Sequence, residues 1–271
     1  MLKTEARNPN TKNVSKESTR KILELIQEEN RVAVSAIDAA IPAIEKSCDL
    51  ISERMAKGGR LIYIGAGTSG RLGVMDAVEC PPTYGVSSEL ISGIIAGGYD
   101  RMFSAAEGAE DSAENGIKDI AAKKLTPLDS VVGISAAGNS AYVAEALLYA
   151  KTLGSLTVGL TSNEDSRLAR EPDVSIITDT GAEVIAGSTR MKAGSAHKMV
   201  LNMISTCVMI KAGNVYENLM INLKPSNIKL KARVISIVKE IFECNDEDAC
   251  KILDKYDWSI KAAVEGEKLS D

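Results

Sequence analysis

The chain has 271 residues, 45% of them hydrophobic and 25% charged, so it fits one large globular domain, with or without a small appendage. Its 32 basic and 37 acidic residues give a net charge of −5, and only 4% of residues are aromatic, which argues against a nucleic-acid partner. The single histidine, His197, excludes most zinc and Ser-His-Asp sites, so we expect no metal, and carboxylates would carry the protons of any catalysed reaction.

The cysteines and the apolar segments indicate the compartment. Five cysteines without a CxxC pair are typical of reduced thiols. The first residues lack the apolar stretch of a signal peptide, and no apolar run reaches the roughly eighteen residues of a membrane span. We therefore expect a cytoplasmic protein with no membrane partner.

The N-terminal quarter of the chain is predicted to be helical after a short arm. Residues 1–17 are polar and contain Asn-Pro-Asn at 8–10, which indicates an arm without a core of its own. From Ser18 to Lys57, apolar residues recur mostly three and four apart, which predicts amphipathic helices with a join or kink at Pro42. Two glycines at 58–59 end this region.

Five short apolar runs rich in β-branched residues come next and predict buried parallel strands at residues 61–64, 90–96, 131–135, 156–161 and 174–178. The segments between them leave room for helices, such as 101–124 and 141–153. This alternation predicts an α/β fold with a doubly wound, parallel five-stranded sheet in an αβα sandwich. Residues 188–212 are predicted to form one long helix, and residues 230–271 a small helical tail, which leaves 18–229 as the main domain.

A glycine loop follows the first predicted strand. Residues 65–70, Gly-Ala-Gly-Thr-Ser-Gly, fit the GxGxxG pattern that lets backbone N–H groups approach a phosphate. The second predicted strand does not end in the acid that a dinucleotide would need. Hydroxyls at Thr68 and Ser69 favour a small terminal phosphate instead. Taken alone, the loop could also be a tight strand-to-helix turn that binds no ligand.

Two further polar segments favour ligand binding over a simple turn. Residues 135–140, Ser-Ala-Ala-Gly-Asn-Ser, follow the third strand, and the carboxyl ends of strands in such sheets form a ligand crevice. Together the two loops favour a sugar phosphate. Residues 187–192, Gly-Ser-Thr-Arg-Met-Lys, open the predicted long helix and add two cations, although Ser188 or Thr189 there could simply cap the helix.

Carboxylates complete the candidate site. Asp76 and Glu79 lie on the helix after the glycine loop, and Cys-Pro-Pro at 80–82 is expected to end that helix, pack against Glu79 and raise its pKa by desolvation. Glu107 and Glu110 stand three apart, hence on one face of a predicted helix. Such spacing usually marks a solvated acidic face, but the small neighbours and the lack of basic residues four positions on favour a ligand.

These motifs together resemble the N-acetylmuramic acid 6-phosphate etherase family. The resemblance rests on residues 59–73, 79–83, 94–98, 107–111 and 187–194, and extends from residue 8 to about residue 230. It implies a cytosolic homodimer built on a sugar isomerase domain that recycles a cell-wall amino sugar, with Glu79 as proton donor and Glu110 as the second catalytic residue. The expected substrate-binding residues are Gly67, Thr68, Ser69, Arg71, Glu107, Ser135, Asn139, Ser140, Ser188, Arg190 and Lys192.

The chemistry that this family implies needs no cofactor. Opening the sugar ring acidifies the C2 proton, a carboxylate removes it, lactate leaves from C3 and water adds to the double bond. Two alternatives stay open at this point: an aldose–ketose isomerase that uses the same C2 proton, and a sugar-phosphate-sensing regulator, because the glucokinase regulatory protein shares two of the motifs. The helical tail is similar to the family's C-terminal three-helix region and is expected to stop earlier.

Overall fold

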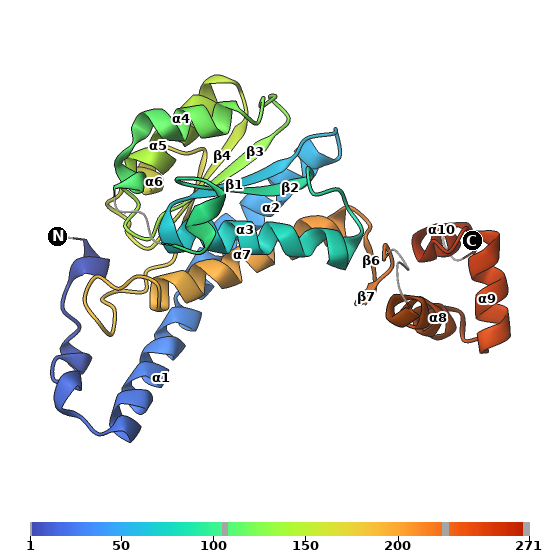
Figure 1. Ribbon diagram of the computed structural model, residues 1–271, viewed down its shortest axis with the longest axis horizontal. Coiled ribbons are helices and arrows are strands. Elements are labelled where there is room, and N and C mark those ends of the chain that lie inside the picture. Colours follow the sequence, from blue (N-terminus) through green and yellow to red (C-terminus); the bar gives the residue numbers. More distant parts are fainter. Residues whose placement is uncertain (1, 105–107, 224–227, 268–271) are drawn as a thin grey trace. The chain divides into compact units, whose positions relative to one another are not determined.

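The computed structural model describes residues 2–104, 108–223 and 228–267 (Figure 1). The chain divides into two compact units, the first formed by Met1–Ala77 and Glu89–Val208, the second by Val78–Ser88 and Met209–Asp271. The expected domain boundaries at residues 17 and 229 stay predictions.

The first unit is built on a parallel five-stranded sheet in the spatial order β2-β1-β3-β4-β5. Its strands are β1 (Leu61–Gly65), β2 (Ile91–Ile95), β3 (Ser130–Ile134), β4 (Leu156–Thr161) and β5 (Val174–Ile177). The predicted doubly wound α/β sheet is therefore confirmed. Since the chain reverses direction across the sheet between β1 and β3, the topological switch point lies at their carboxyl ends.

Helices cover both faces of this sheet (Figure 1). They are α2 (Ile41–Met55), α3 (Gly67–Tyr84), α4 (Ala113–Ala121), α5 (Ala141–Thr152), α6 (Arg167–Arg170) and α7 (Lys192–Lys211); α3 and α7 continue into the second unit. Helix α1 (Thr19–Ser35) precedes α2 and extends away from the sheet (Figure 1). Side chains alternate along β1: Ile62 and Ile64 join the core formed with α4 and α5, while Tyr63 faces α3 at Gly73. As predicted, Pro42 stands at the start of α2, after the join with α1.

Two predicted helices begin later than expected. The 101–124 segment forms the 3-10 turns η5 (Tyr99–Met102) and η6 (Ala109–Asp111) before α4. Gly108 has a left-handed backbone with φ 73°, and the Ser112 hydroxyl caps α4 by accepting from the Asn115 N–H at 3.3 Å. Glu110 thus lies in a 3-10 turn rather than in the predicted helix. Glu107 lies outside the described residues, so the face predicted to be shared by the two acids stays a prediction.

The long helix likewise starts at Lys192 rather than at residue 188. The Glu183 carboxylate accepts from the backbone N–H groups of Lys192 and Ala193, at 2.9 and 3.0 Å. The first N–H groups of a helix have no partner within it, so the carboxylate that binds them defines the helix start. Its negative charge also interacts favourably with the positive end of the helix dipole. Ser188 and Thr189 therefore precede the helix instead of capping it.

The helix that carries Glu79 also departs from expectation. α3 passes through Pro81 and Pro82 and ends at Tyr84, after which Gly85 has φ 63°. The two prolines lack the N–H groups that would bond the carbonyls of residues 77 and 78, so the last turn of α3 has fewer hydrogen bonds than a regular helix. The predicted packing of Glu79 against this segment is wrong, because its side chain is exposed.

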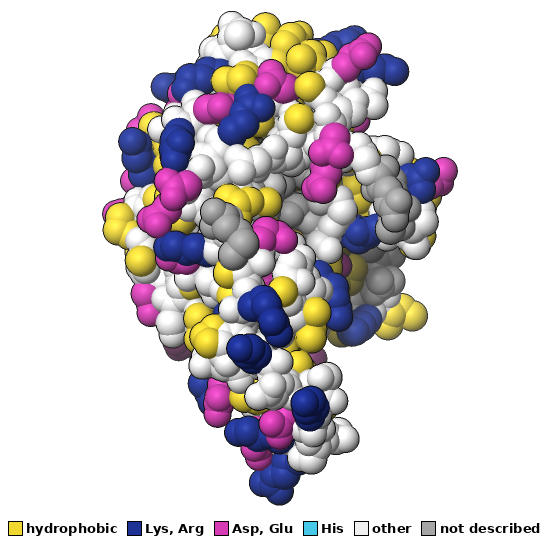
Figure 2. Space-filling view, turned by 90° about the vertical axis from the view of Figure 1, so that its left-hand side faces the viewer, with side chains coloured by type: hydrophobic (Ala, Val, Ile, Leu, Met, Phe, Trp, Pro, Cys, Tyr) yellow, Lys and Arg dark blue, Asp and Glu magenta, His cyan; other side chains and the backbone are white. Residues whose placement is uncertain are grey.

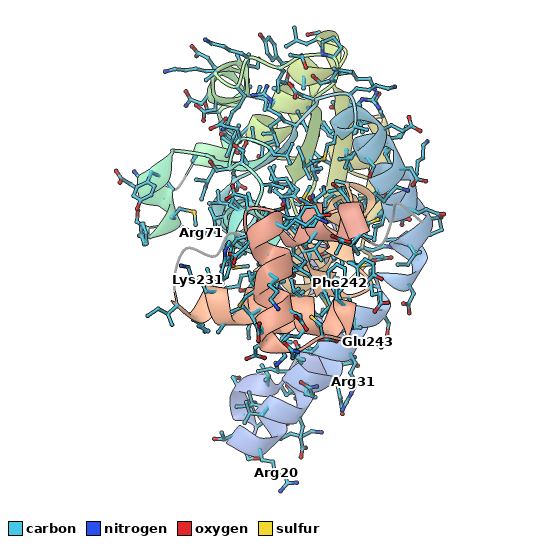
Figure 3. The ribbon with its side chains drawn as sticks, turned by 90° about the vertical axis from the view of Figure 1, so that its right-hand side faces the viewer. Arg20, Arg31, Arg71, Lys231, Phe242 and Glu243 are labelled. Atoms are coloured by element: carbon cyan, nitrogen blue, oxygen red, sulfur yellow. The ribbon has the colours of Figure 1, made fainter. Side chains whose placement is uncertain are left out.

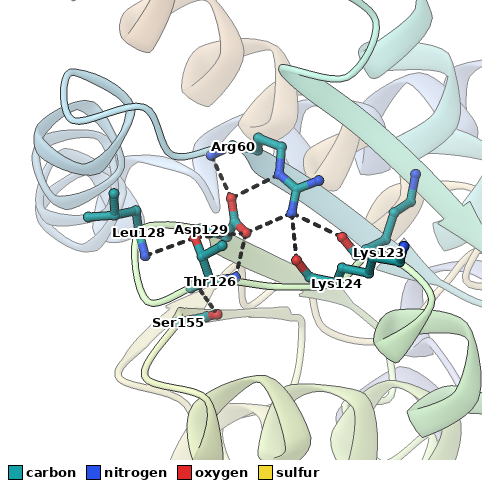
Figure 4. Close-up of polar contacts among 7 residues, drawn as sticks. All are labelled: Arg60, Lys123, Lys124, Thr126, Leu128, Asp129 and Ser155. Atoms are coloured by element: carbon teal, nitrogen blue, oxygen red, sulfur yellow. Dashed lines mark hydrogen bonds and ion pairs between the residues drawn. The ribbon is translucent and has the colours of Figure 1, made fainter.

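An ion pair fastens the amino ends of β1 and β3 (Figure 4). Asp129, 1% exposed, accepts from the Arg60 guanidinium at 3.0 and 2.8 Å and from the Arg60 backbone N–H at 2.9 Å. Thr126 donates its N–H and its hydroxyl to the same carboxylate. Burial opposes ionisation, but the hydrogen bonds from Arg60 and Thr126 hold the pKa of Asp129 below its usual value.

The N-terminal arm lies against the first unit as three 3-10 turns, η1 (Lys3–Glu5), η2 (Pro9–Thr11) and η3 (Val14–Lys16). Its buried polar side chains bond distant backbone and side-chain groups: Thr4 accepts from Asn163 at 3.0 Å, and Thr11 donates to the carbonyl of Val184 at 2.8 Å. The arm is held by hydrogen bonds rather than by an apolar core.

The second unit has its own apolar core. It contains a two-stranded ribbon, β6 (Val215–Tyr216) and β7 (Leu219–Met220), and the helices α8 (Ile228–Phe242), α9 (Asp246–Lys255) and α10 (Ile260–Glu267). The core side chains include Val234, Val238, Leu253 and Ile260. No helix in the described ranges has both the length and the apolar character that crossing a membrane requires. On the face shown in Figure 2, basic and acidic side chains are interspersed.

Candidate functional site

A cavity of about 250 Å³ lies in the first unit where the loops after β1 and β3 meet. It is lined by Glu5, Ala66, Gly67, Thr68, Ser69, Glu110, Ile134, Ser135, Ala136, Ala137, Ser140, Gly187, Thr189 and Gly194. Six of the residues predicted from sequence are therefore brought together: Gly67, Thr68, Ser69, Glu110, Ser135 and Ser140. The cavity stands at the topological switch point, where open α/β sheets bind their ligands.

The loop after β1 is shaped by a close backbone contact. A Cβ on Gly65 would lie 2.7 Å from the backbone nitrogen of Gly70, and a Cβ on Gly70 would lie 2.5 Å from the Gly65 carbonyl oxygen, so only glycine fits at either position. This contact lets α3 begin directly after β1. Within the described residues, the hydroxyls of Thr68 and Ser69 have no partner in the protein, which leaves them to bind a ligand at the positive end of α3.

The loop after β3 supplies the second set of hydroxyls. The Ser135 hydroxyl accepts from the Gly138 N–H at 3.0 Å, and its own hydrogen stays available to a ligand. Ser140 precedes α5 and donates to the Glu110 carbonyl at 2.9 Å. This bond ties the turn that carries Glu110 to the loop after β3. Two helix N-termini and several hydroxyls thus converge on one small cavity, an arrangement that suits an anionic group.

The predicted acids have different positions. Glu110 lines the cavity with an exposed side chain, and Glu79 lies in the second unit, on the part of α3 beyond Ala77. Glu107 lies outside the described residues. Asp76 is buried and accepts from Asn202 and Ser205 of α7, at 2.5 and 3.1 Å.

Several predicted binding residues do not line the cavity. Arg71 donates to the carbonyls of Met102 and Ser104, at 3.1 and 2.8 Å, and so fastens the segment after β2 to α3. The Asn139 side chain accepts from the Arg167 N–H at 3.0 Å, at the start of α6. The cavity-lining set also lacks Ser188, Arg190 and Lys192.

Lys192 instead forms a buried ion pair with Glu29 of α1. Burial opposes ionisation of Glu29, but hydrogen bonds from Lys192, Asn8 and Asn10 hold the pKa of Glu29 below its usual value. This ion pair neutralises the lysine inside the protein. No Lys or Arg belongs to the described cavity lining, so the hydroxyls and helix ends supply the attraction for an anion.

His197 lies on α7 and does not line the cavity. Its side chain is 1% exposed, and its Nε2 atom lies 3.2 Å from the Ser162 hydroxyl, so this histidine is buried and hydrogen-bonded. Burial lowers its pKa to about 4, so the imidazole is neutral near pH 7.

Two polar residues of the cavity were not predicted from sequence, Glu5 and Thr189. Thr189 belongs to a segment that the sequence does single out, but only as a possible helix cap. Glu5 lies far before the glycine loop in the chain, and no local pattern indicates where the arm that carries it would lie.

Two domain families match this chain: residues 43–151 match the Glucokinase regulatory protein N-terminal SIS domain, and residues 106–207 match the SIS domain. Solved structures with a similar fold include a phosphoheptose isomerase from Francisella tularensis, with TM-score 0.52 and 16% identity over 71% of this chain and 98% of that one. The phosphoheptose isomerase from Neisseria gonorrhoeae has TM-score 0.52 and 18% identity over 70% of this chain and 97% of that one. The fold and the cavity therefore define a SIS-domain protein.

Relatives with much higher identity cover nearly the whole chain. The N-acetylmuramic acid 6-phosphate etherase of Clostridium beijerinckii is 50% identical over 263 residues, 97% of this chain and 86% of that protein. The protein of the same name from Bacillus subtilis strain 168 is 48% identical over the same shares. The chain belongs to the N-acetylmuramic acid 6-phosphate etherase family.

Proposed function

We propose that this protein is an N-acetylmuramic acid 6-phosphate etherase, a carbon–oxygen lyase that converts its substrate and water into N-acetylglucosamine 6-phosphate and D-lactate. The observation that carries the proposal is the cavity at the switch point, where two hydroxyl-bearing loops and two helix N-termini meet beside Glu110. The names of relatives that are about half identical to the chain point to the same reaction. The product would return a cell-wall amino sugar to metabolism.

The proposed reaction proceeds by elimination and addition. With the ring open, the C1 aldehyde acidifies the C2 proton, and a carboxylate takes that proton while the C3–O bond breaks. The lactyl oxygen leaves with a proton from a second carboxyl, so lactate keeps the ether oxygen. Water then adds at C3 and gives the new hydroxyl. Glu110 lines the cavity and fits the base at C2 or at water, and Glu79 is the proposed proton donor.

The test is to incubate the protein with N-acetylmuramic acid 6-phosphate in ¹⁸O-labelled water. We expect release of D-lactate without label and a sugar product labelled at O3, because elimination breaks the C3–O bond. A ketose product without lactate would identify an aldose–ketose isomerase. Binding without turnover would favour a regulator.

The proposed phosphate ligands are Ser69 and Ser135, with help from Thr68. Ser140, also expected from sequence, would join them only by exchanging its bond to the Glu110 carbonyl for one to the phosphate, and Asn139 does not line the cavity. We expect Ser69→Ala to weaken substrate binding by about 1.5–3 kcal/mol, because the variant loses a hydrogen bond to a charged group. Titration calorimetry with N-acetylglucosamine 6-phosphate measures the change. Ser15→Ala is the matched control, since Ser15 is exposed on the arm and does not line the cavity. Equal affinities of Ser69→Ala and the control would count against this assignment.

The proposed assembly is a homodimer in the cytoplasm. Helix α1 supports it, since only Glu29 and Ala33 of its side chains are buried, while Leu23 and Val34 are 60% and 56% exposed. Figure 3 shows Arg20 and Arg31 projecting from the same helix. Light scattering should give twice the chain mass, and Leu23→Glu should shift the population toward monomer. The five cysteines, all among the described residues, form no disulfide, which fits a reducing compartment; cell fractionation would check the location.

A further inference from the structure

The N-terminal arm brings a carboxylate to the cavity that the proposed chemistry has not yet used. Glu5 lines the cavity together with Thr68, Ser69 and Ser135. Its carboxylate lies against the loop before α7, where a Cβ on Gly187 would be 3.1 Å from Oε2. Among the described residues, this carboxylate has no hydrogen-bond or ion-pair partner. An unpartnered acid therefore stands in a cavity whose other polar groups are mainly hydroxyls and helix N-termini.

The position of Glu5 is fixed by its neighbours in the arm. On one side, Lys3 forms ion pairs with Glu164 and Asp179, at 3.0 and 2.6 Å. Next to it, the buried Thr4 hydroxyl accepts from Asn163 at 3.0 Å. On the other side, Asn8 donates to the Ala182 carbonyl at 3.2 Å. These contacts hold the backbone around residue 5 without using its side chain, so the carboxylate is placed by the fold and left available.

The charge of Glu5 determines which part of a ligand it can contact. A carboxylate would repel a neighbouring phosphate. The positive helix ends and the hydroxyl donors of the two loops already offer the phosphate a binding position. A sugar, by contrast, carries hydroxyl and amide hydrogens, which are donors that an ionised carboxylate accepts strongly. The acid suits the sugar part of the ligand and excludes the phosphate from its side of the cavity.

We propose that Glu5 is a substrate-binding residue that accepts hydrogen bonds from the hydroxyl or amide donors of the sugar ring, and so sets the orientation of the sugar phosphate in the cavity. This inference rests on the proposed function for the identity of the sugar. It assigns the arm a direct part in the site. Glu5 and Glu110 then contribute two carboxylates to one cavity, one for binding and one for proton transfer.

The test compares two ligands with Glu5→Gln, using calorimetry on the full chain. Affinity for N-acetylglucosamine 6-phosphate should fall roughly tenfold to a hundredfold, since a hydrogen bond to a charged acceptor is lost. Affinity for inorganic phosphate should stay within about twofold or improve, because a nearby negative charge is removed. Glu5→Asp should retain part of the sugar affinity. Glu17→Gln, an exposed acid of the same arm outside the cavity lining, is the control and should bind both ligands as the wild type does.

Two results would overturn the proposal. Unchanged affinity of Glu5→Gln for the sugar phosphate would show that the carboxylate makes no contact with the sugar. A parallel loss of affinity for both ligands, with faster tryptic cleavage after Arg7, would show that Glu5 acts only by holding the arm and the loop at Gly187. The proposed reaction is tested separately: wild-type protein that binds the sugar phosphate but releases no lactate would contradict the reaction and leave the Glu5 comparison valid.

Discussion

Glu79→Gln and Glu110→Gln should each lower the turnover of N-acetylmuramic acid 6-phosphate by about 10²–10⁴-fold, because general acid–base groups contribute on that order. Phosphate binding should be largely kept, since neither side chain supplies the hydroxyls of the two loops. Initial rates of D-lactate release measure the turnover. Glu114→Gln is the matched control for Glu110, because Glu114 is exposed on the neighbouring helix α4 and does not line the cavity.

The two variants should also differ from each other, which separates the two proton transfers. In deuterated water, Glu79→Gln should still exchange the C2 hydrogen of the substrate, since the base remains, while lactate release is slow. Glu110→Gln should lose both the exchange and the release. Full activity in either variant would contradict the assignment. Exchange retained in Glu110→Gln and lost in Glu79→Gln would reverse the two roles.

The exposure of Glu79 adds one condition to its assignment as the proton donor. The sequence predicts a buried Glu79, packed against the prolines that follow it, whereas the side chain is exposed in the single chain. Any burial during the reaction would have to come from bound substrate or from a second copy of the chain. The two-carboxylate mechanism needs unequal proton affinities, so the pH dependence of turnover, measured together with the oligomeric state, is the informative measurement.

The sheet was predictable because its signal is local. Each strand is a short apolar run rich in β-branched residues, and all five lie within one residue of the predicted bounds. The two loops that carry the candidate phosphate ligands were predictable for the same reason, since glycine and hydroxyl residues directly follow β1 and β3. A doubly wound sheet then necessarily brings both loops to one edge.

The remaining features depend on contacts between distant segments. Lys192 looked like a free cation near a phosphate, but Glu29, 163 residues away in the chain, neutralises it. The long helix starts where the Glu183 carboxylate meets it, not at the Ser-Thr pair that the local pattern favours. Glu5 reaches the cavity because buried Thr4 bonds Asn163, 159 residues further on. No periodicity or motif encodes such pairings, so only the folded chain identifies them.

Asp129→Ala should lower the free energy of unfolding by about 3–5 kcal/mol, because it removes the buried partner of the ion pair and leaves the partly buried Arg60 with only the carbonyls of Lys123 and Lys124 as acceptors. The donors that would lose the Asp129 carboxylate as acceptor are the Arg60 guanidinium and backbone N–H, and the N–H and hydroxyl of Thr126. Urea unfolding followed by far-ultraviolet circular dichroism measures the change. Asp165→Ala is the control, since the Arg170–Asp165 pair is 64% and 82% exposed and should contribute less than about 1 kcal/mol.

The pH dependence of the unfolding free energy tests whether the ionised Asp129 carboxylate is responsible for this stabilisation. The folded-state pKa of Asp129 is lowered, so its contribution is complete above the pKa of about 3.9 that an unfolded aspartate has, and is lost as the pH falls below that value. The stability difference between wild type and Asp129→Asn should therefore be constant from about pH 5 to 7, at roughly the neutral-pH value, and shrink as the pH falls below about 4. A difference that grows in acid, or a cost of Asp129→Ala no larger than that of Asp165→Ala, would show that the Arg60–Asp129 pair does not hold the amino ends of β1 and β3 together.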